Sequence, residues 1–160
     1  MNYSQVTVKL DKKMRALCVF AYPGHPKGCP NFDKRHDCPP KIGFFEDIFD
    51  IKSPIFAIWN IFDIEAHVNK MKDKHANWSE RQLKCCLYWQ PGARKKLKEN
   101  IISFMREHPG YSATACPEAM GVNITETMNS IGIKLEWPPE KNAYQIALAG
   151  IKIRKNIHGN

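Results

Sequence analysis

Apolar residues along the chain fall into short runs bounded by turn-forming residues. Runs of this length that are rich in β-branched and aromatic residues are typical of strands. The densest run, PIFAIWNIF at residues 54–62, predicts a central strand. Further strands are expected at residues 15–22, 133–137 and 143–150, with a short strand or an arm at residues 4–10.

Between these runs, apolar positions recur at helical spacing, and residues that commonly begin helices precede them. Asp63 and Asn123 are expected N-caps, and either Ser79 or Asn77 would begin a further helix. Pro91 and Gly92 would break or kink that helix. The expected helices cover residues 44–50, a segment after Asp63, 77–90, 93–107 (with apolar positions Leu97, Ile101, Ile102 and Met105) and 124–131.

The alternation of strands and helices predicts an α/β fold. We expect a single compact domain over residues 1–160, with a central mixed sheet of about four or five strands flanked by helices. Residues 1–10 would form the arm, if there is one, and residues 151–160 a basic tail. Hydrophobic residues make up 43% and charged residues 25% of the chain, which is typical of a globular protein.

The longest irregular stretch is residues 23–43, which contains five prolines and three glycines and has no hydrophobic period. A structureless loop of this length inside a compact domain needs a stabilising element. The loop contains Cys29, Cys38, His25 and His36. A bound metal could replace the missing hydrophobic core and order this cysteine-bearing loop.

Six cysteines are present, and none of them form a Cys-x-x-Cys pair, which argues against a zinc finger or a thioredoxin-like redox pair. Three of them, Cys29, Cys38 and Cys116, are followed directly by proline, whereas chance would give about 0.4 such pairs. Proline restricts the preceding residue and stiffens the turn that holds the thiolate. The alternative is that cysteines and prolines merely share loops. The expected ligands are Cys29, Cys38, Cys116 and one of Cys85 and Cys86, with Cys86 slightly favoured.

Four dispersed thiolates suit a [4Fe–4S] cluster or a tetrahedral zinc ion. His25 or His36 could complete a site of three cysteines, or both could be solvated. A three-cysteine cluster would leave one iron open to substrate, whereas four cysteines would make it structural or electron-carrying. Cys18, in the middle of the run at 15–22, is expected to be a core thiol.

The segment CPNFDKRHDCPP at residues 29–40 resembles a box in an uncharacterised family of predicted metal-binding proteins. That box reads Cys-Pro-Asn-aromatic, then five residues, then Cys-Pro-Pro. The resemblance covers a dozen of the 160 residues and implies that Cys29 and Cys38 bind an iron–sulfur cluster. The family usually has glycine where this chain has Asp33, and another cysteine just upstream, where this chain has Pro26 beside His25.

The chain has 24 basic and 16 acidic side chains, which gives a net charge of +8 and favours polyanionic partners. The second hypothesis is therefore a nucleic-acid-associated module with a structural zinc site, binding tRNA or another polyanion. Its contacts would be Arg94, Lys95, Lys96 and Lys98, together with the tail and with Trp78, Trp89 and Tyr111 for stacking.

No apolar stretch has the length of a membrane span, and the N-terminus has no run of the signal-peptide type. We therefore expect a soluble, cytoplasmic protein with no membrane partner, whose thiols stay reduced. Neither a glycine-rich phosphate loop nor a serine nucleophile elbow nor an HExxH motif occurs, so the residues identify no reaction. A redox or sulfur-handling role is the expectation for the metal site, and a plain interaction protein is the remaining alternative.

Overall fold

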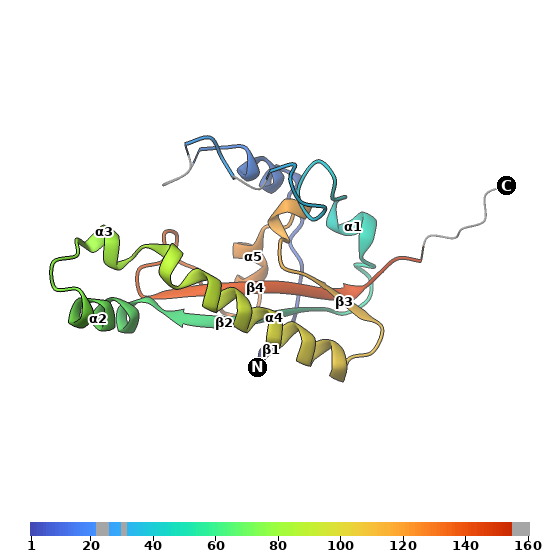
Figure 1. The fold of residues 1–160 in the computed structure, drawn as a ribbon. Coiled ribbons are helices and arrows are strands. Elements are labelled where there is room, and N and C mark those ends of the chain that lie inside the picture. The colour runs from blue at the N-terminus through green and yellow to red at the C-terminus, as the bar shows by residue number, and fades with distance from the viewer. Residues whose placement is uncertain (22–25, 30–31, 155–160) are drawn as a thin grey trace.

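Four strands form one sheet in the order β1-β2-β4-β3 (Figure 1). The computed structural model describes residues 1–21, 26–29 and 32–154. The strands are β1 (Asn2–Val6), β2 (Ile55–Asp63), β3 (Tyr111–Thr114) and β4 (Asn142–Ile151). The expected α/β class and a sheet of four strands are confirmed. All pairings between these strands are antiparallel, whereas the sequence had suggested a mixed sheet.

The two long strands β2 and β4 form the centre of the sheet, as expected for the apolar run at 54–62. Ile58 pairs with Ala147, and both are fully buried. Residues 55–59 of β2 alternate between two covered faces, so both parities are apolar there, whereas Ile61 near the end of the strand is 47% exposed. This explains why the run appears continuous rather than alternating.

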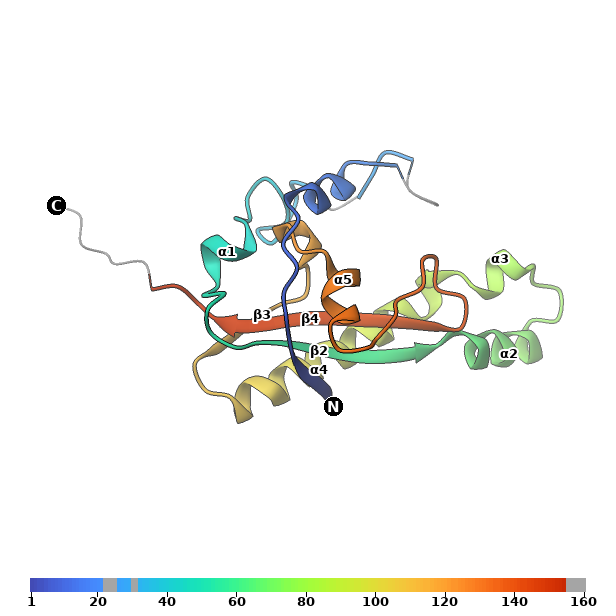
Figure 2. The same ribbon diagram turned by 180° about the vertical axis from the view of Figure 1, so that it is seen from behind.

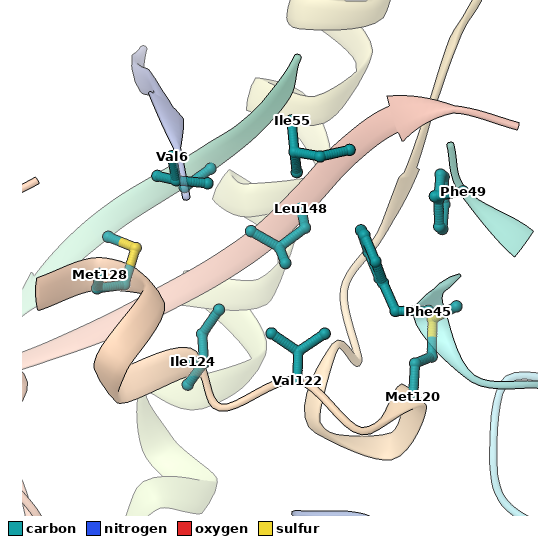
Figure 3. Packing of buried hydrophobic residues seen from close by; sticks show 10 residues of the cluster. Val6, Phe45, Phe49, Ile55, Met120, Val122, Ile124, Met128 and Leu148 are labelled. Atoms are coloured by element: carbon teal, nitrogen blue, oxygen red, sulfur yellow. The ribbon is translucent and has the colours of Figure 1, made fainter. Parts of the chain in front are cut away.

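Helix α4 (Gln90–Glu107) covers one face of the sheet (Figure 1). Phe104 of α4 is fully buried and packs with Ile58 and Ala149. Asn60 projects to the same face, where its side-chain amide donates a hydrogen bond to the carbonyl of Ala93 over 3.3 Å. The opposite face carries the larger apolar cluster, to which β4, the short helices α1 (Phe45–Ile48) and α5 (Ile124–Asn129) and the segment before α5 contribute (Figure 3).

The expected helix starts are confirmed at the three caps. The Asp63 carboxylate accepts a hydrogen bond from the Ala66 amide at 2.8 Å and begins α2 (Ile64–Lys74). Ser79, rather than Asn77, caps α3 (Glu80–Leu83), and Asn123 caps α5. No helix in the described part of the chain is long and apolar enough to cross a membrane.

The predicted helix 77–90 is interrupted. After α3 the chain forms the short 3₁₀ turn η2 (Cys86–Tyr88), and α4 begins at Gln90. Pro91 therefore lies in the first turn of α4, where its missing N–H costs nothing. Gly132 has a φ of +78° after α5, as the predicted end of that helix requires.

Two predicted strands are wrong. Residues 12–18 form a 3₁₀ helix, η1 (Lys12–Cys18), which Asp11 caps. The apolar run continues into Val19 and Phe20, which are 49% and 60% exposed, so no sheet partner covers it.

Residues 133–137 are not a strand either. Two prolines follow them, and proline cannot donate to a sheet ladder. The short strand β3 was not predicted, because its four half-buried residues have no apolar alternation.

The apolar positions of α4 also differ from those expected. Leu97 is buried, as predicted, and Ile101 is half-buried, but Ile102 is 48% exposed and Met105 is 38% exposed. The buried stripe is Ala93, Leu97, Asn100 and Phe104. The polar residue Asn100 belongs to this buried stripe. The apolar residues of the sequence therefore indicated a hydrophobic face about one position away from the face that is buried.

Phe104 tests this assignment of the helix face. We expect Phe104→Ala to lower the free energy of unfolding by about 3–5 kcal/mol, because it empties a fully buried site. Ile102→Ala, on the exposed side of the same helix, should change it by no more than about 0.5 kcal/mol. Urea unfolding followed by circular dichroism measures both. Equal effects at the two positions would contradict the packing of α4.

Candidate metal centre

Three segments meet on the α5 side of the sheet (Figure 2), and the third is far from the other two in the sequence. They are η1, which ends at Cys18, the loop that contains Cys29 and Cys38, and the turn η3 (Glu118–Met120), which follows Cys116. η1 packs directly on η3. In Figure 2 the 3₁₀ helix η1 lies on the α5 side of the sheet, above the chain that leads into α5. The fold therefore brings four thiol-bearing positions into one region.

Arg15 of η1 fastens these segments together. Its Nε donates a hydrogen bond to the carbonyl of Ala119 in η3 at 2.9 Å. A terminal guanidinium nitrogen donates to the carbonyl of Ile42, at the end of the cysteine-bearing loop. The guanidinium also lies over the ring of Phe44, 4.2 Å from its centroid. One side chain thus holds η1, the loop and η3 in place, because the rigid fork of arginine can serve several acceptors.

Cys18 and Cys29 are held next to each other by the backbone. The Cys29 amide donates a hydrogen bond to the Cys18 carbonyl at 2.9 Å. Gly28 makes this approach possible: its φ is +79°, and a Cβ there would lie 2.8 Å from the carbonyl carbon of Val19. Because other residues rarely adopt this conformation and have no space here, glycine is required.

A tight turn presents Cys38 on the inner side of the loop. The Cys38 amide donates to the Arg35 carbonyl at 3.1 Å, and the Ile42 amide donates to the Cys38 carbonyl at 3.1 Å. Asp33 closes the loop, since its amide donates to the carbonyl of Pro39 at 3.0 Å. Asp33 has a φ of +54°, a left-handed conformation that aspartate tolerates better than most residues.

Cys116 lies in the connection between β3 and η3. Its amide donates to the Thr114 hydroxyl at 3.3 Å, and Pro117 behind it is fully buried. The Pro117 carbonyl accepts from the amides of Met120 and Val122 at 3.0 and 3.1 Å. Cys116 is therefore placed by a rigid, core-anchored turn rather than by an open loop.

The thiols affect one another electrostatically. Burial raises the pKa of Cys18, and the neighbouring Cys29 and Cys38 add to this rise. Burial likewise raises the pKa of Cys116 to about 11, with further contributions from Asp37, Glu118 and Cys38. A thiolate formed at one position is thus opposed by negative charge at the others. Arg15 and Arg35 lower these pKa values, but more weakly.

Glu118 adds a carboxyl group to the same region. Burial raises its pKa, opposed by a hydrogen bond from its own backbone amide. Together with Asp37, it makes the region a collection of groups that become negative when they lose a proton. Such a donor set is suited to a cation, which would reverse the electrostatic cost of deprotonation.

The structure thus brings together three of the expected ligands, Cys29, Cys38 and Cys116, and adds Cys18. Cys18 is half-buried at the end of η1 rather than a core thiol of a strand, so that expectation is corrected. Its sequence signal was weak, because it lies in an apolar run and no proline follows it. Within residues 1–21, 26–29 and 32–154, no three His, Cys, Asp or Glu side chains are arranged to hold one metal ion.

Cys85 and Cys86 lie elsewhere, at the turn η2, which packs on α4. Cys86 is exposed and Cys85 half-buried. Neither contributes to the pKa values of Cys18 and Cys116. His36 is exposed on the loop surface. The other expected histidine, His25, lies outside the described residues, as do Pro30 and Asn31 of the box and residues 155–160 of the tail.

The basic residues proposed for nucleic acid lie on the exposed side of α4, namely Arg94, Lys95, Lys96 and Lys98. Lys96 is 3.8 Å from the carboxylate of Glu99. The aromatic residues expected beside them are less accessible. Trp89 is 8% exposed and stacks on Phe62 at 4.7 Å, and Tyr111 is half-buried against Phe56 and Phe104. Burial therefore makes Trp89 unavailable for stacking, whereas a stacking role for Tyr111 and nucleic-acid binding itself stay predictions.

Comparisons of the chain with protein-family models, with curated proteins and with solved structures gave no match. Function therefore has to be inferred from the residues of this chain.

Gly28 tests the backbone contact between Cys18 and Cys29. We expect Gly28→Ala to lower the free energy of unfolding by at least about 1–2 kcal/mol, because it forces a left-handed alanine against the Val19 backbone. The matched control is Gly92→Ala in α4, where nothing lies within 4 Å. This control should raise stability by up to about 1 kcal/mol. Unchanged stability in Gly28→Ala would contradict the close approach.

Cys116 tests the electrostatics of the metal-free protein. A rise in its pKa from 9.0 to about 11 lowers its thiolate fraction near pH 8 by roughly 100-fold. Iodoacetamide should therefore label Cys116 far more slowly than the exposed Cys86, and its rate should still be rising above pH 10. Peptide mass spectrometry over a pH series measures both rates. A Cys116 labelling rate that levels off at pH 9 would contradict the raised pKa, because the thiol would then be fully ionised at that pH.

Proposed function

We propose that this chain is a metal-binding protein that holds a [4Fe–4S] cluster through Cys18, Cys29, Cys38 and Cys116. The observation that carries the proposal is the convergence of η1, the neighbouring loop and the remote turn η3, which are tied together by Arg15 and by the Cys29–Cys18 backbone hydrogen bond. Iron–sulfur clusters are commonly held by four cysteine thiolates. No other region of the described chain gathers as many thiols.

The box at Cys29 and Cys38, which resembles one in a family of predicted metal-binding proteins, favours a cluster over a single zinc ion. A tetrahedral zinc ion needs all four sulfurs about 2.3 Å from one point. The described residues contain no such group, although the thiols lie close enough to raise one another's pKa values. An iron–sulfur cluster binds each cysteine to a different iron, so its ligands lie further apart. Zinc is the alternative metal.

The conformation of Asp33 supports the resemblance to the family of predicted metal-binding proteins. That family usually has glycine at this position of the Cys-Pro-Asn-aromatic box, and Asp33 has the positive φ that glycine adopts most readily. The box and this turn together favour a loop that curls around a metal between Cys29 and Cys38.

The ligand set also bears on the role of the cluster. Four cysteines leave no iron open, so the cluster would carry electrons or hold the loop in place rather than bind a substrate. We therefore favour a redox role over sulfur handling. The reduced thiols that such a site needs are maintained in the cytoplasm.

The test is metal analysis of protein purified without air. We expect about four irons and four acid-labile sulfides per chain, with broad absorption near ~400 nm. Single serine substitutions of Cys18, Cys29, Cys38 and Cys116 should each remove most of the cluster, because each deletes one iron ligand. Cys85→Ser and Cys86→Ser are the matched controls and should retain it.

Two results would contradict the proposal. Stoichiometric zinc that persists after anaerobic iron reconstitution would assign the thiols to zinc. Loss of iron in Cys85→Ser or Cys86→Ser, with retention in Cys18→Ser, would restore the ligand set expected from the sequence.

A further inference from the structure

Strand β4 is only partly covered on the side away from β2. Strand β3 pairs with the end of β4, from Thr114 opposite Leu148 to Tyr111 opposite Ile151. Residues 142–147 pair with β2 but have no strand on their other side within the described chain. Figure 1 shows β3 beside the end of β4 that leads to the C-terminus, whereas α2 and α3 lie near the other end.

The register fixes which backbone groups face this open side. The Ile64 amide donates to the Lys141 carbonyl at 2.8 Å, so Ile64 and Lys141 form a hydrogen-bonded pair. The next pair along the ladder, Asp63 and Asn142, is therefore a non-bonded pair. Because bonded and non-bonded pairs alternate in antiparallel ladders, residues 143, 145 and 147 bond to β2. The amides and carbonyls of Asn142, Tyr144 and Ile146 therefore point outward. The described structure contains no hydrogen bond to these outward groups.

A cavity of about 850 Å³ lies along the beginning of this open edge, beside Asn142, Tyr144 and Gln145. Its volume is within the range of ligand-binding sites. One wall comes from the α3–η2 region and includes Arg81, Lys84 and Trp89. The other comes from the segment between α5 and β4 and includes Leu135, Trp137 and Pro138.

We propose that this groove binds an extended peptide segment of another protein, which adds as a strand beside residues 142–146 of β4. An unpaired row of amides and carbonyls is the feature that an added strand satisfies, and a small molecule would leave most of it unpaired. The site is independent of the candidate metal centre, because none of the four cluster cysteines lines it.

The two walls determine the chemistry of the peptide. Side chains of an added strand alternate between the two faces of the sheet. On the α4 face, which Gln145 shares with Asn60, they meet Arg81 and Lys84. Positions pointing to this wall should therefore be acidic.

On the other face, the peptide side chains meet Tyr144 and the wall of Leu135 and Trp137. Trp137 is 66% exposed, and its indole nitrogen donates to the Thr125 hydroxyl at 3.0 Å, which directs the ring towards α5. Glu136 and Glu140 also line the groove from this segment and would repel acidic side chains. The partner segment should thus alternate acidic and apolar residues.

Amide hydrogen exchange of the free protein is the first arm of the test. We expect the Tyr144 and Ile146 amides to exchange at least about 100-fold faster than those of Ala143 and Gln145, which bond to β2. Slow exchange of Tyr144 and Ile146 at all protein concentrations would overturn the open edge. Protection that appears only at high protein concentration would assign the edge to a second copy of this chain and would also overturn the proposal.

The second arm uses a phage-displayed library of random decapeptides, selected on the wild-type protein. Enriched sequences should alternate acidic and apolar residues, and the synthetic peptides should slow exchange at Tyr144 and Ile146. Arg81→Glu and Trp137→Ala, both at exposed positions, should weaken binding at least tenfold. Arg94→Glu, the same charge change on the outer side of α4, should not. N-methylation of peptide amides that face β4 should abolish binding.

The proposal fails if no sequence is enriched over selection on the Trp137→Ala protein. It also fails if the enriched peptides leave exchange at Tyr144 and Ile146 unchanged, or if N-methylated peptides bind equally well. Cys29→Ser should not affect peptide binding, so the outcome does not depend on the metal.

Discussion

The anchoring of Arg15 is the interaction on which the candidate metal centre depends. The described residues of the loop at 26–43 contribute few buried side chains, so hydrophobic burial alone does not hold this part of the loop. Arg15 binds carbonyls at the end of this loop and in η3, and its guanidinium covers Phe44. The contacts of Arg15 with two backbone carbonyls and with the Phe44 ring thus hold the loop in place of a hydrophobic core. Since Phe44 directly precedes α1, the same contact connects the loop to the main apolar cluster of the sheet.

The unequal strand lengths divide the sheet into two ends with different properties. Where β3 pairs with β4, all four strands are linked and the apolar cluster of Phe45, Phe49 and Leu148 fills the α5 face (Figure 3). The turn with Cys116 leaves β3 here, so the candidate metal centre is built on this closed end. At the other end β4 has one partner only, and its second edge borders a cavity. The single long strand β4 is thus paired on both sides at one end and leaves one edge open at the other.

Local signals in the sequence predicted the helices and the central strands well. Asp63, Ser79 and Asn123 cap helices because their side chains satisfy amides within three residues, which needs no tertiary information. The run at 54–62 predicted a strand correctly, because β-branched and aromatic residues dominate it. The run at 15–22 looks equally apolar, but its described residues are half-buried or exposed, because Asp11 starts a 3₁₀ helix and the loop approaches its backbone at Gly28. That tertiary contact has no local signature, so the false strand and the wrong expectation of a core thiol at Cys18 have the same origin.

The prolines after Cys38 and Cys116 are a local signal for a turn, which the sequence reveals. That these cysteines bind a metal stays a prediction, and which further thiol lies near them depends on which segments of the chain meet. Burial raises the pKa values of Cys18, Cys116 and Glu118, and the Glu118 carboxylate adds to the rise at both thiols. Burial in the metal-free chain therefore disfavours the charged forms of these three groups. Folded proteins retain such conflicts mainly at functional sites. A bound cation would turn the same arrangement from a cost into a source of stability, because it stabilises the deprotonated form of every thiol that it contacts.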